Sequence, residues 1–250
     1  MRNVWTIARR EYSRFFSSPV AYVVAFVLLL VLGIMFSLTV LVYMQAAYNG
    51  SIGNSAPDIG GITGTFGFLF VLTIPALTMR LVSDENRMGT MELLLTAPVR
   101  DWELIVGKWL GGFLFMVSVI LVSLIYPLIL NALESPGIDQ GQMLIGYLGV
   151  IFVAASFLAL GVGISALFTN QIAAFFVTLV TFIVLWWMLS FGAQYVTGGA
   201  DFFNYLNMQH HFYDSMNNGT INLSDISYFL SLIALGLFTG TAAVEARRWS

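Results

Sequence analysis

Long apolar stretches without a charged residue dominate the sequence. Asp, Glu, Lys and Arg are absent from five long ranges, 15–57, 59–79, 109–133, 140–200 and 226–244. A helix needs about 20 apolar residues to cross the hydrocarbon of a bilayer. The longest range is divided by the polar run 169–171 and therefore holds two crossings. The pattern predicts six spans, at about 19–43, 62–81, 105–130, 144–168, 172–191 and 226–244.

Composition agrees with a membrane protein and excludes several other classes. Only 9% of the residues are charged and 58% are hydrophobic, and the mean hydropathy is +0.86. A soluble domain has about 25% charged residues. The net charge of −3, with no dense basic patch, argues against nucleic-acid binding. Strand periodicity is absent, so we expect an all-α, polytopic membrane protein with residues 1–250 in one transmembrane domain.

The distribution of basic residues predicts the topology. All ten Lys and Arg residues lie before the first span, in or at the edges of the loop between spans two and three, or after the last span. They are Arg2, Arg9, Arg10, Arg14, Arg80, Arg87, Arg100, Lys108, Arg247 and Arg248. Because basic residues accumulate on the cytoplasmic side, both termini are predicted to be cytoplasmic, which requires an even number of spans.

An amphipathic helix is predicted before the first span, at about 3–17. Arg9, Arg10 and Arg14 lie on its polar half, whereas Glu11 is the one charged residue inside the apolar half. Such a helix is expected to lie flat at the membrane interface with its arginines toward anionic headgroups. The alternative is a docking surface for a partner, which Glu11 suggests.

A second short helix is predicted in the loop between spans two and three, at about 83–101. Gly89 can end a preceding helix, and Thr90 can cap a new one. Glu92 would lie in the first turn, where the helix dipole favours an anion. Pro98 ends the helix, because the residue before proline is disfavoured in the α conformation.

The apolar side of this loop helix is formed by Met91, Leu94 and Leu95. Asp101 could then cap the following span. The helix could lie against the membrane, or it could enter a cleft in a cytoplasmic partner. The pattern alone favours neither interpretation.

Small residues and prolines indicate how the spans pack. Three pairs of small residues at four-residue spacing allow close helix approach. They are Gly107/Gly111, Gly161/Ser165 and Gly236/Gly240. Pro75 and Pro127 can kink their spans, and each leaves a backbone carbonyl that a neighbour must satisfy.

Several catalytic and nucleotide-binding motifs are absent. The one Gly-Lys pair, at 107–108, is followed by Trp109 and lies in no Walker A motif, so the chain does not bind ATP by that route. Neither H-E-x-x-H nor G-x-S-x-G occurs. No charged residue lies near the middle of a predicted span, which argues against an ion-coupled transporter.

The two histidines, His210 and His211, are adjacent and fall in a predicted outer loop. With Met208, Asp214 and Met216 they could form a metal site, but adjacent histidines point in different directions on a helix, so we predict no metal site. A less favoured alternative is an intramembrane lipid-modifying enzyme that uses a histidine and Asp214 as acid and base.

Three segments together resemble the ABC-2 type transporter permeases. Glu85…Gly89-Thr90-Met-Glu92-Leu-Leu-Leu95-Thr-Ala-Pro98-Val99, followed by Gly107-Lys108, is similar to their signature. Arg9-Arg10-Glu11-Tyr-Ser-Arg-Phe-Phe16-Ser-Ser-Pro19 resembles their opening segment. The C-terminal part, from His211-Phe212 through Gly219 and Asp225-Ile-Ser-Tyr228 to Arg247-Arg-Trp249, resembles the gliding-motility branch, with the nitrous-oxide-reductase maturation permeases nearby.

The resemblance implies a half-size permease and roles for two sets of residues. The segment at 3–17 would be an elbow helix, and the loop would contain a coupling helix that enters the groove of an ATPase. The implied elbow-interface residues are Arg9, Arg10, Glu11 and Arg14. The implied coupling residues are Glu85, Gly89, Thr90, Glu92, Leu94, Leu95 and Pro98. This chain would have no catalytic residue and bind no cofactor, since ATP and Mg belong to the partner.

The resemblance also implies partners and a location. Two cytoplasmic ATPase subunits and a second permease subunit, identical or related, would complete an exporter in the bacterial inner membrane. An accessory periplasmic or membrane subunit is also compatible with the resemblance. A membrane scaffold that anchors an ATPase assembly without transporting anything is the main alternative.

Overall fold

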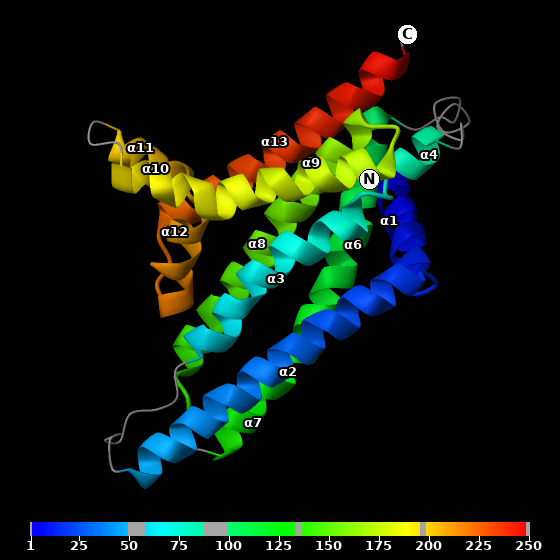
Figure 1. Ribbon diagram of the computed structural model, residues 1–250. Coiled ribbons are helices and arrows are strands. Elements are labelled where there is room, and N and C mark those ends of the chain that lie inside the picture. Colours follow the sequence, from blue (N-terminus) through cyan, green and yellow to red (C-terminus); the bar gives the residue numbers. More distant parts are fainter. Residues whose placement is uncertain (1, 50–58, 88–99, 134–136, 196–198, 249–250) are drawn as a thin grey trace.

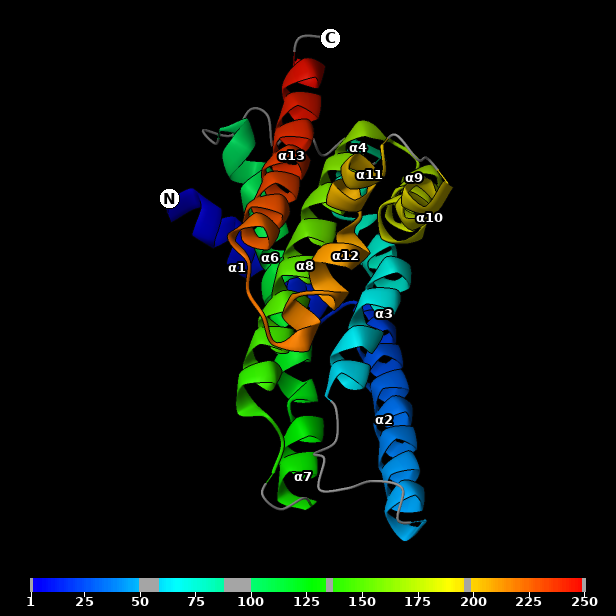
Figure 2. The same cartoon turned by 90° about the vertical axis from the view of Figure 1, so that its left-hand side faces the viewer.

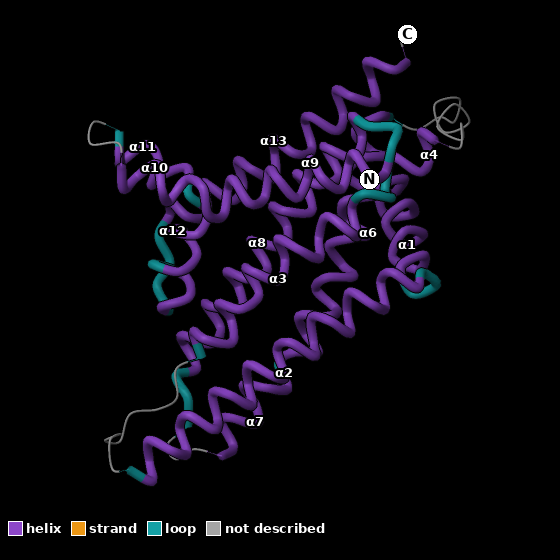
Figure 3. The backbone as a smooth tube through the Cα atoms, viewed as in Figure 1, coloured by secondary structure: helices purple, strands orange, loops and turns teal. Residues whose placement is uncertain are grey.

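Helices form nearly all of the structure, a computed structural model that describes residues 2–49, 59–87, 100–133, 137–195 and 199–248 (Figures 1 and 3). Within these ranges there is no strand. Six helical segments in them are long and apolar enough to cross a membrane. They are Pro19–Ala46, Gly60–Glu85, Asp101–Leu133, Gln140–Leu167, Gln171–Gly192 and Leu223–Arg247. The predicted all-α class and the six predicted spans are therefore confirmed.

The described residues form a series of helical elements. In chain order they are α1 (Arg2–Phe15), α2 (Pro19–Tyr48), α3 (Gly60–Thr78), α4 (Ser83–Arg87), α6 (Asp101–Ser123), α7 (Ile125–Leu133), α8 (Gln140–Leu167), α9 (Gln171–Ile183), the π-helix η1 (Val184–Met188), α10 (Leu189–Tyr195), α11 (Ala200–Leu206), α12 (Met208–Tyr213), the 3-10 helix η2 (Met216–Asn218) and α13 (Leu223–Arg248). In Figure 1, α1, α4 and the C-terminal end of α13 lie at one end of the bundle. The side of the membrane that this end faces stays a prediction.

The third span is broken at Leu124, between α6 and α7, close to Pro127. Proline has no backbone N–H, so the carbonyl of Ser123, four residues earlier, loses its helical partner. The Tyr147 hydroxyl on α8 lies 3.2 Å from that carbonyl and donates to it. The expected kink at Pro127, with a neighbour that satisfies the freed carbonyl, is therefore confirmed.

Helix α8 is the centre of the bundle. Most of its apolar segment is buried, and it packs against α3, α6, α9 and α13 (Figure 2). A Cβ atom on Gly236 of α13 would lie 2.4 Å from the Ala159 carbonyl carbon of α8, and one on Gly163 would lie 2.5 Å from the Gly236 oxygen. The two helices therefore touch backbone to backbone. The predicted close approach at Gly236 is confirmed, whereas Gly163 was not predicted.

Polar side chains begin two of the spans. Asp139 accepts hydrogen bonds from the backbone N–H groups of Gly141 and Gln142, at 2.8 and 3.1 Å, and caps α8. Asn170 caps α9 in the same way, through the Ile172 N–H at 2.9 Å. The prediction that Asp101 caps α6 is wrong, because Asp101 is already the first helical residue. Arg100 is the N-cap residue of α6, and the Glu103 carboxylate accepts a hydrogen bond from its backbone N–H at 3.1 Å.

The segment between the fifth and sixth spans is not a simple outer loop. It forms α11, α12 and η2, which fold back onto the bundle. The Tyr213 hydroxyl donates to the Gly64 carbonyl of α3 at 2.7 Å, and the Asn217 amide donates to the Gly60 carbonyl at 3.1 Å. This return segment is therefore fixed to the start of α3.

Candidate functional site: a buried charge cluster where α1, α4 and α6 meet

Helix α1 runs alongside the first turns of α6 in the same direction, and two glycines allow this. A Cβ on Gly107 would lie 2.8 Å from the Ile7 Cβ, and one on Gly111 would lie 2.6 Å from the Glu11 Cβ. Further along, the rings of Phe15 and Phe115 stack with centroids 5.0 Å apart. The apolar half of α1 thus packs on protein. Trp5 of that half stays exposed, and the expectation that α1 lies at the membrane interface stays a prediction.

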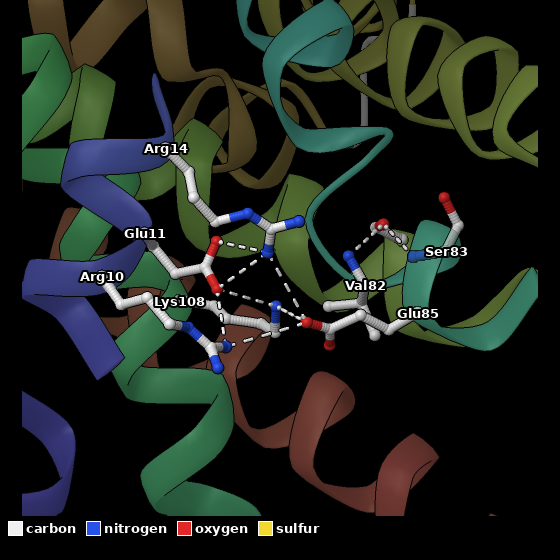
Figure 4. Close-up of polar contacts among 8 residues, drawn as sticks. Arg10, Glu11, Arg14, Val82, Ser83, Glu85 and Lys108 are labelled. Carbon is white, nitrogen blue, oxygen red and sulfur yellow. Dashed lines mark hydrogen bonds and ion pairs between the residues drawn. The ribbon is translucent and has the colours of Figure 1, made fainter. Parts of the chain in front are cut away.

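Lys108 lies at the centre of the contact between α1, α4 and α6 (Figure 4). Its side chain is fully buried, at 0% exposed. The Nζ atom donates to Glu85 Oε1 on α4 at 2.8 Å and to Glu11 Oε1 on α1 at 3.4 Å. A buried charge is costly unless it is paired, and this lysine has a carboxylate from each of two other elements.

Two arginines of α1 close the cluster from the outside (Figure 4). Arg10 and Arg14 lie 3.0 and 3.3 Å from Glu11 Oε1, and 3.9 and 3.8 Å from Glu85 Oε1. Both arginine side chains are about half exposed, at 49% and 55%. We refer to Arg10, Glu11, Arg14, Glu85 and Lys108 as the charge cluster.

The charges around Glu11 decide its ionisation. Burial alone would raise the pKa of this carboxyl, but the positive charges of Lys108, Arg14 and Arg10 together outweigh burial and lower the pKa below its usual value. Glu11 is therefore a carboxylate at neutral pH. The cluster consists of ionic contacts among charged groups, and it contains no feature of acid–base catalysis.

The start of the loop between spans two and three is fixed to α8 as well. The Ser165 hydroxyl accepts hydrogen bonds from the backbone N–H groups of Val82 and Ser83, at 3.3 and 3.2 Å. Only Asp84 separates these two residues from Glu85. Ser165 belongs to the predicted small-residue pair with Gly161, and a Cβ on Gly161 would lie 2.5 Å from the Thr78 hydroxyl. The chain therefore enters this loop from a rigid support on α8, with Glu85 held by Lys108.

The structure brings together four of the predicted site residues, namely Arg10, Glu11 and Arg14 of the elbow set and Glu85 of the coupling set. Arg9, the other elbow residue, is exposed. The other coupling residues, Gly89, Thr90, Glu92, Leu94, Leu95 and Pro98, lie outside the described residues.

Lys108 was not predicted as a site residue. Its sequence signal was present, since it is a charged residue three positions inside the predicted span 105–130 and stands beside a glycine. Glu11 was noticed as a charge in the apolar half of α1 and taken as a hint of partner docking. The structure turns Glu11 inward, toward Lys108, and removes that reason for proposing a partner at Glu11.

The two histidines serve different purposes. His210 is exposed, and its Nδ1 lies 2.5 Å from Asp214. His211 is buried, with Nδ1 2.7 Å from Asp225 Oδ1 and Nε2 2.9 Å from the Tyr205 carbonyl oxygen. Because both ring nitrogens of His211 face acceptors inside the fold, His211 joins the return segment to α13. This arrangement counts against the acid–base role that the enzyme alternative requires.

The predicted metal-ligand candidates are not assembled into a site. Met208 and Met216 are buried in the apolar core, away from the exposed pair formed by His210 and Asp214. Among the residues that the structure describes, no group of three or more His, Cys, Asp or Glu side chains could hold a metal ion.

Comparison with known proteins gives the family. Residues 5–244 match the model of the ABC-2 family transporter proteins. The chain is also 25% identical, over 174 residues, to the probable ABC transporter permease protein NosY of Stutzerimonas stutzeri. That match covers 64% of this chain and 60% of the relative, so the chain spans less than two thirds of the relative's length. Because the family model covers nearly the whole chain, this protein belongs to the ABC-2 family of transporter proteins.

Proposed function

We propose that this chain is the membrane-spanning permease subunit of an ATP-driven transporter whose ATPase is a separate chain. Family membership and the six spans support the permease role. The absence of a Walker A motif from the sequence supports a separate ATPase. ATP and Mg would then bind to the partner, and this chain would affect the partner only through contacts between the two proteins.

The observation that carries the proposal is the position of Lys108. Glu85 belongs to the loop that would meet the ATPase, and Lys108 joins it to α6 at 2.8 Å and to Glu11 of α1 at 3.4 Å. A displacement of the loop would therefore move the start of α6 and the whole of α1 together. Rigid-body movement of helices about such contacts is a common way to change access across a membrane protein.

Other features of the complex follow from the family resemblance. We propose two cytoplasmic ATPase subunits, a second permease subunit that is identical or related, and outward transport. Location in the bacterial inner membrane with both termini in the cytoplasm follows from the same resemblance and from the distribution of basic residues. Placement in the gliding-motility branch stays a prediction.

Affinity purification of the full chain from its native membrane, followed by an ATPase assay on the eluate, tests the proposal. We expect an ATPase with Walker motifs to co-purify. Leu95→Asp should remove it, because a carboxylate would replace the apolar side of the predicted coupling helix. Glu85→Gln should leave the ATPase bound but reduce its stimulation by the permease, because Lys108 would lose a charged partner. Asp84→Asn, one residue earlier on α4, is the matched control.

Four outcomes separate the alternatives. Loss of stimulation in Glu85→Gln but not in Asp84→Asn supports coupling through the charge cluster. Equal stimulation in the wild type and both α4 variants would show that the cluster has no part in coupling. Purification without any ATPase, under conditions that keep the chain folded, would overturn the permease proposal itself. Hydrolysis that never moves a substrate would favour the scaffold alternative.

A further inference from the structure

The exposed half of α1 is basic and is covered by no other part of the described chain. Its buried half packs on α6, and the side chains that remain outside are polar and basic apart from Trp5. Trp5, Thr6, Arg9, Arg10, Ser13 and Arg14 line a shallow hollow of about 560 Å³ on this half. No acidic side chain lines the hollow. We refer to it as the arginine hollow.

The positive charge of the arginine hollow is only partly neutralised. Arg10 and Arg14 share the carboxylates of Glu11 and Glu85 with the buried Lys108, so three cations meet two anions. Arg9 adds a further cation outside the cluster. A site of this kind attracts an anion, and a guanidinium group matches the geometry of a phosphate.

The depth of the hollow in the bundle indicates the source of the anion. Arg10 and Arg14 flank Glu11 on α1, which adjoins Gly111 of α6. Gly111 lies inside the predicted span at 105–130, so these arginines emerge near the boundary between headgroups and hydrocarbon. The chain then enters α2, the least buried of the six spans, where Tyr22 and Phe26 are exposed. Trp5, 58% exposed at the rim of the hollow, is typical of residues at that boundary.

We propose that the arginine hollow binds the phosphate of an anionic phospholipid. Arg9, Arg10 and Arg14 would supply the charge, and the Ser13 hydroxyl would be placed to donate a hydrogen bond. The acyl chains would extend along the exposed apolar side chains at the start of α2. This site would exist whether or not the chain is coupled to an ATPase.

Native mass spectrometry of the full chain in mild detergent tests the proposal, with phosphatidylglycerol and phosphatidylcholine of equal chain length as probes. We expect phosphatidylglycerol to be retained in preference to phosphatidylcholine, and the preference to weaken as salt rises. Arg9→Gln should weaken phosphatidylglycerol binding about fivefold, the effect of one basic residue near a membrane surface. Arg9 does not belong to the charge cluster, so this variant leaves the cluster in place. Arg2→Gln, an equal loss of charge on α1 outside the hollow, is the matched control.

Competition with inorganic phosphate distinguishes the two sources of the anion. Phosphatidylglycerol that stays bound in millimolar phosphate, with chloride at equal ionic strength as the reference, supports a lipid site. Displacement by phosphate but not by chloride would overturn the lipid assignment and leave a site for free phosphate. Equal weakening by Arg2→Gln and Arg9→Gln would mean diffuse attraction to charge, and unchanged binding in Arg9→Gln would also overturn the proposal. Protection of the hollow by a co-purified ATPase, with no lipid retained, would assign this face to the partner.

Discussion

Replacing Lys108 with methionine keeps an unbranched apolar side chain, one atom shorter, and removes the buried charge. At an effective dielectric constant of about 20, the lysine attracts Glu85 at 2.8 Å by about 6 kcal/mol and Glu11 at 3.4 Å by about 5 kcal/mol, before the cost of burying the charges is subtracted. Removing one partner of a buried ion pair costs about 3–5 kcal/mol, because a buried charge stays behind. Arg10 and Arg14 would still face both carboxylates, so we expect a loss near the lower limit, about 3 kcal/mol.

Thermal unfolding of the detergent-solubilised chain, followed by tryptophan fluorescence, measures this loss. For a chain of this size, about 3 kcal/mol corresponds to a lower midpoint by about 10 °C. The double variant Lys108→Met/Glu85→Gln should recover part of the loss, because it removes the stranded carboxylate as well. The losses of unfolding free energy in the two single variants should therefore add up to about 2 kcal/mol more than the loss in the double variant.

Two results would refute this reasoning. The first is a free energy of unfolding for Lys108→Met within about 0.5 kcal/mol of the wild-type value, which is the usual limit for a surface substitution. The lysine would then not hold the cluster together. If the losses of the single variants simply add in the double variant, Lys108 and Glu85 do not interact. In the second case the loss in Lys108→Met would come from the contact with Glu11 and not from Glu85.

The remaining predictions concern three other contacts. Gly236→Leu should prevent folding or cost more than about 4 kcal/mol of unfolding free energy, because a Cβ there would meet the backbone of α8 at 2.4 Å. Gly61→Ala should be neutral in the same unfolding assay, because a Cβ there would have no atom within 4 Å. His211→Ala should destabilise by about 3 kcal/mol, because buried Asp225 would lose its histidine partner and keep the hydrogen bond from Ser215, whereas exposed His210→Ala should cost under about 0.5 kcal/mol. Glu11 has a pKa below its usual 4.5 in the fold, so the stability it contributes is present above pH 4.5 and is lost as the pH falls through the lowered value. Glu11→Gln should therefore show a weaker fall of the unfolding midpoint in acid than the wild type, and an unchanged acid profile would contradict the lowered pKa.

The spans could be predicted from the sequence because each is a long apolar run with polar ends, a signal that does not depend on neighbouring helices. The close approaches at Gly107, Gly111 and Gly236 were predictable for a similar reason, since a small residue at regular spacing has few other uses in a span. The partner of each glycine was not predictable. Periodicity along one helix shows which residues share a face, and it does not show which other helix covers that face.

The charge cluster shows the same limit. Glu11 was visible as a misplaced charge, Glu85 as part of a loop, and Lys108 as a basic residue near a span. Each of the three charges alone is expensive to bury, so local patterns assign them to water or to a partner. Their burial becomes favourable only when α1, α4 and α6 meet. The return segment was missed for a related reason, because its helices are short and hold their place through contacts such as Tyr213 to the Gly64 carbonyl.

The backbone contact between α8 and α13 limits the degrees of freedom of the bundle. Neighbouring helices usually slide past one another by small changes in the rotamers of the side chains between them. Around Gly163 and Gly236 no such layer of side chains exists, so sliding or rotation at this contact would bring backbone atoms into collision. The two helices must therefore move as one body. A spectroscopic probe attached near the C-terminal end of α13 would consequently report the motion of α8, whose middle is too deeply buried to label.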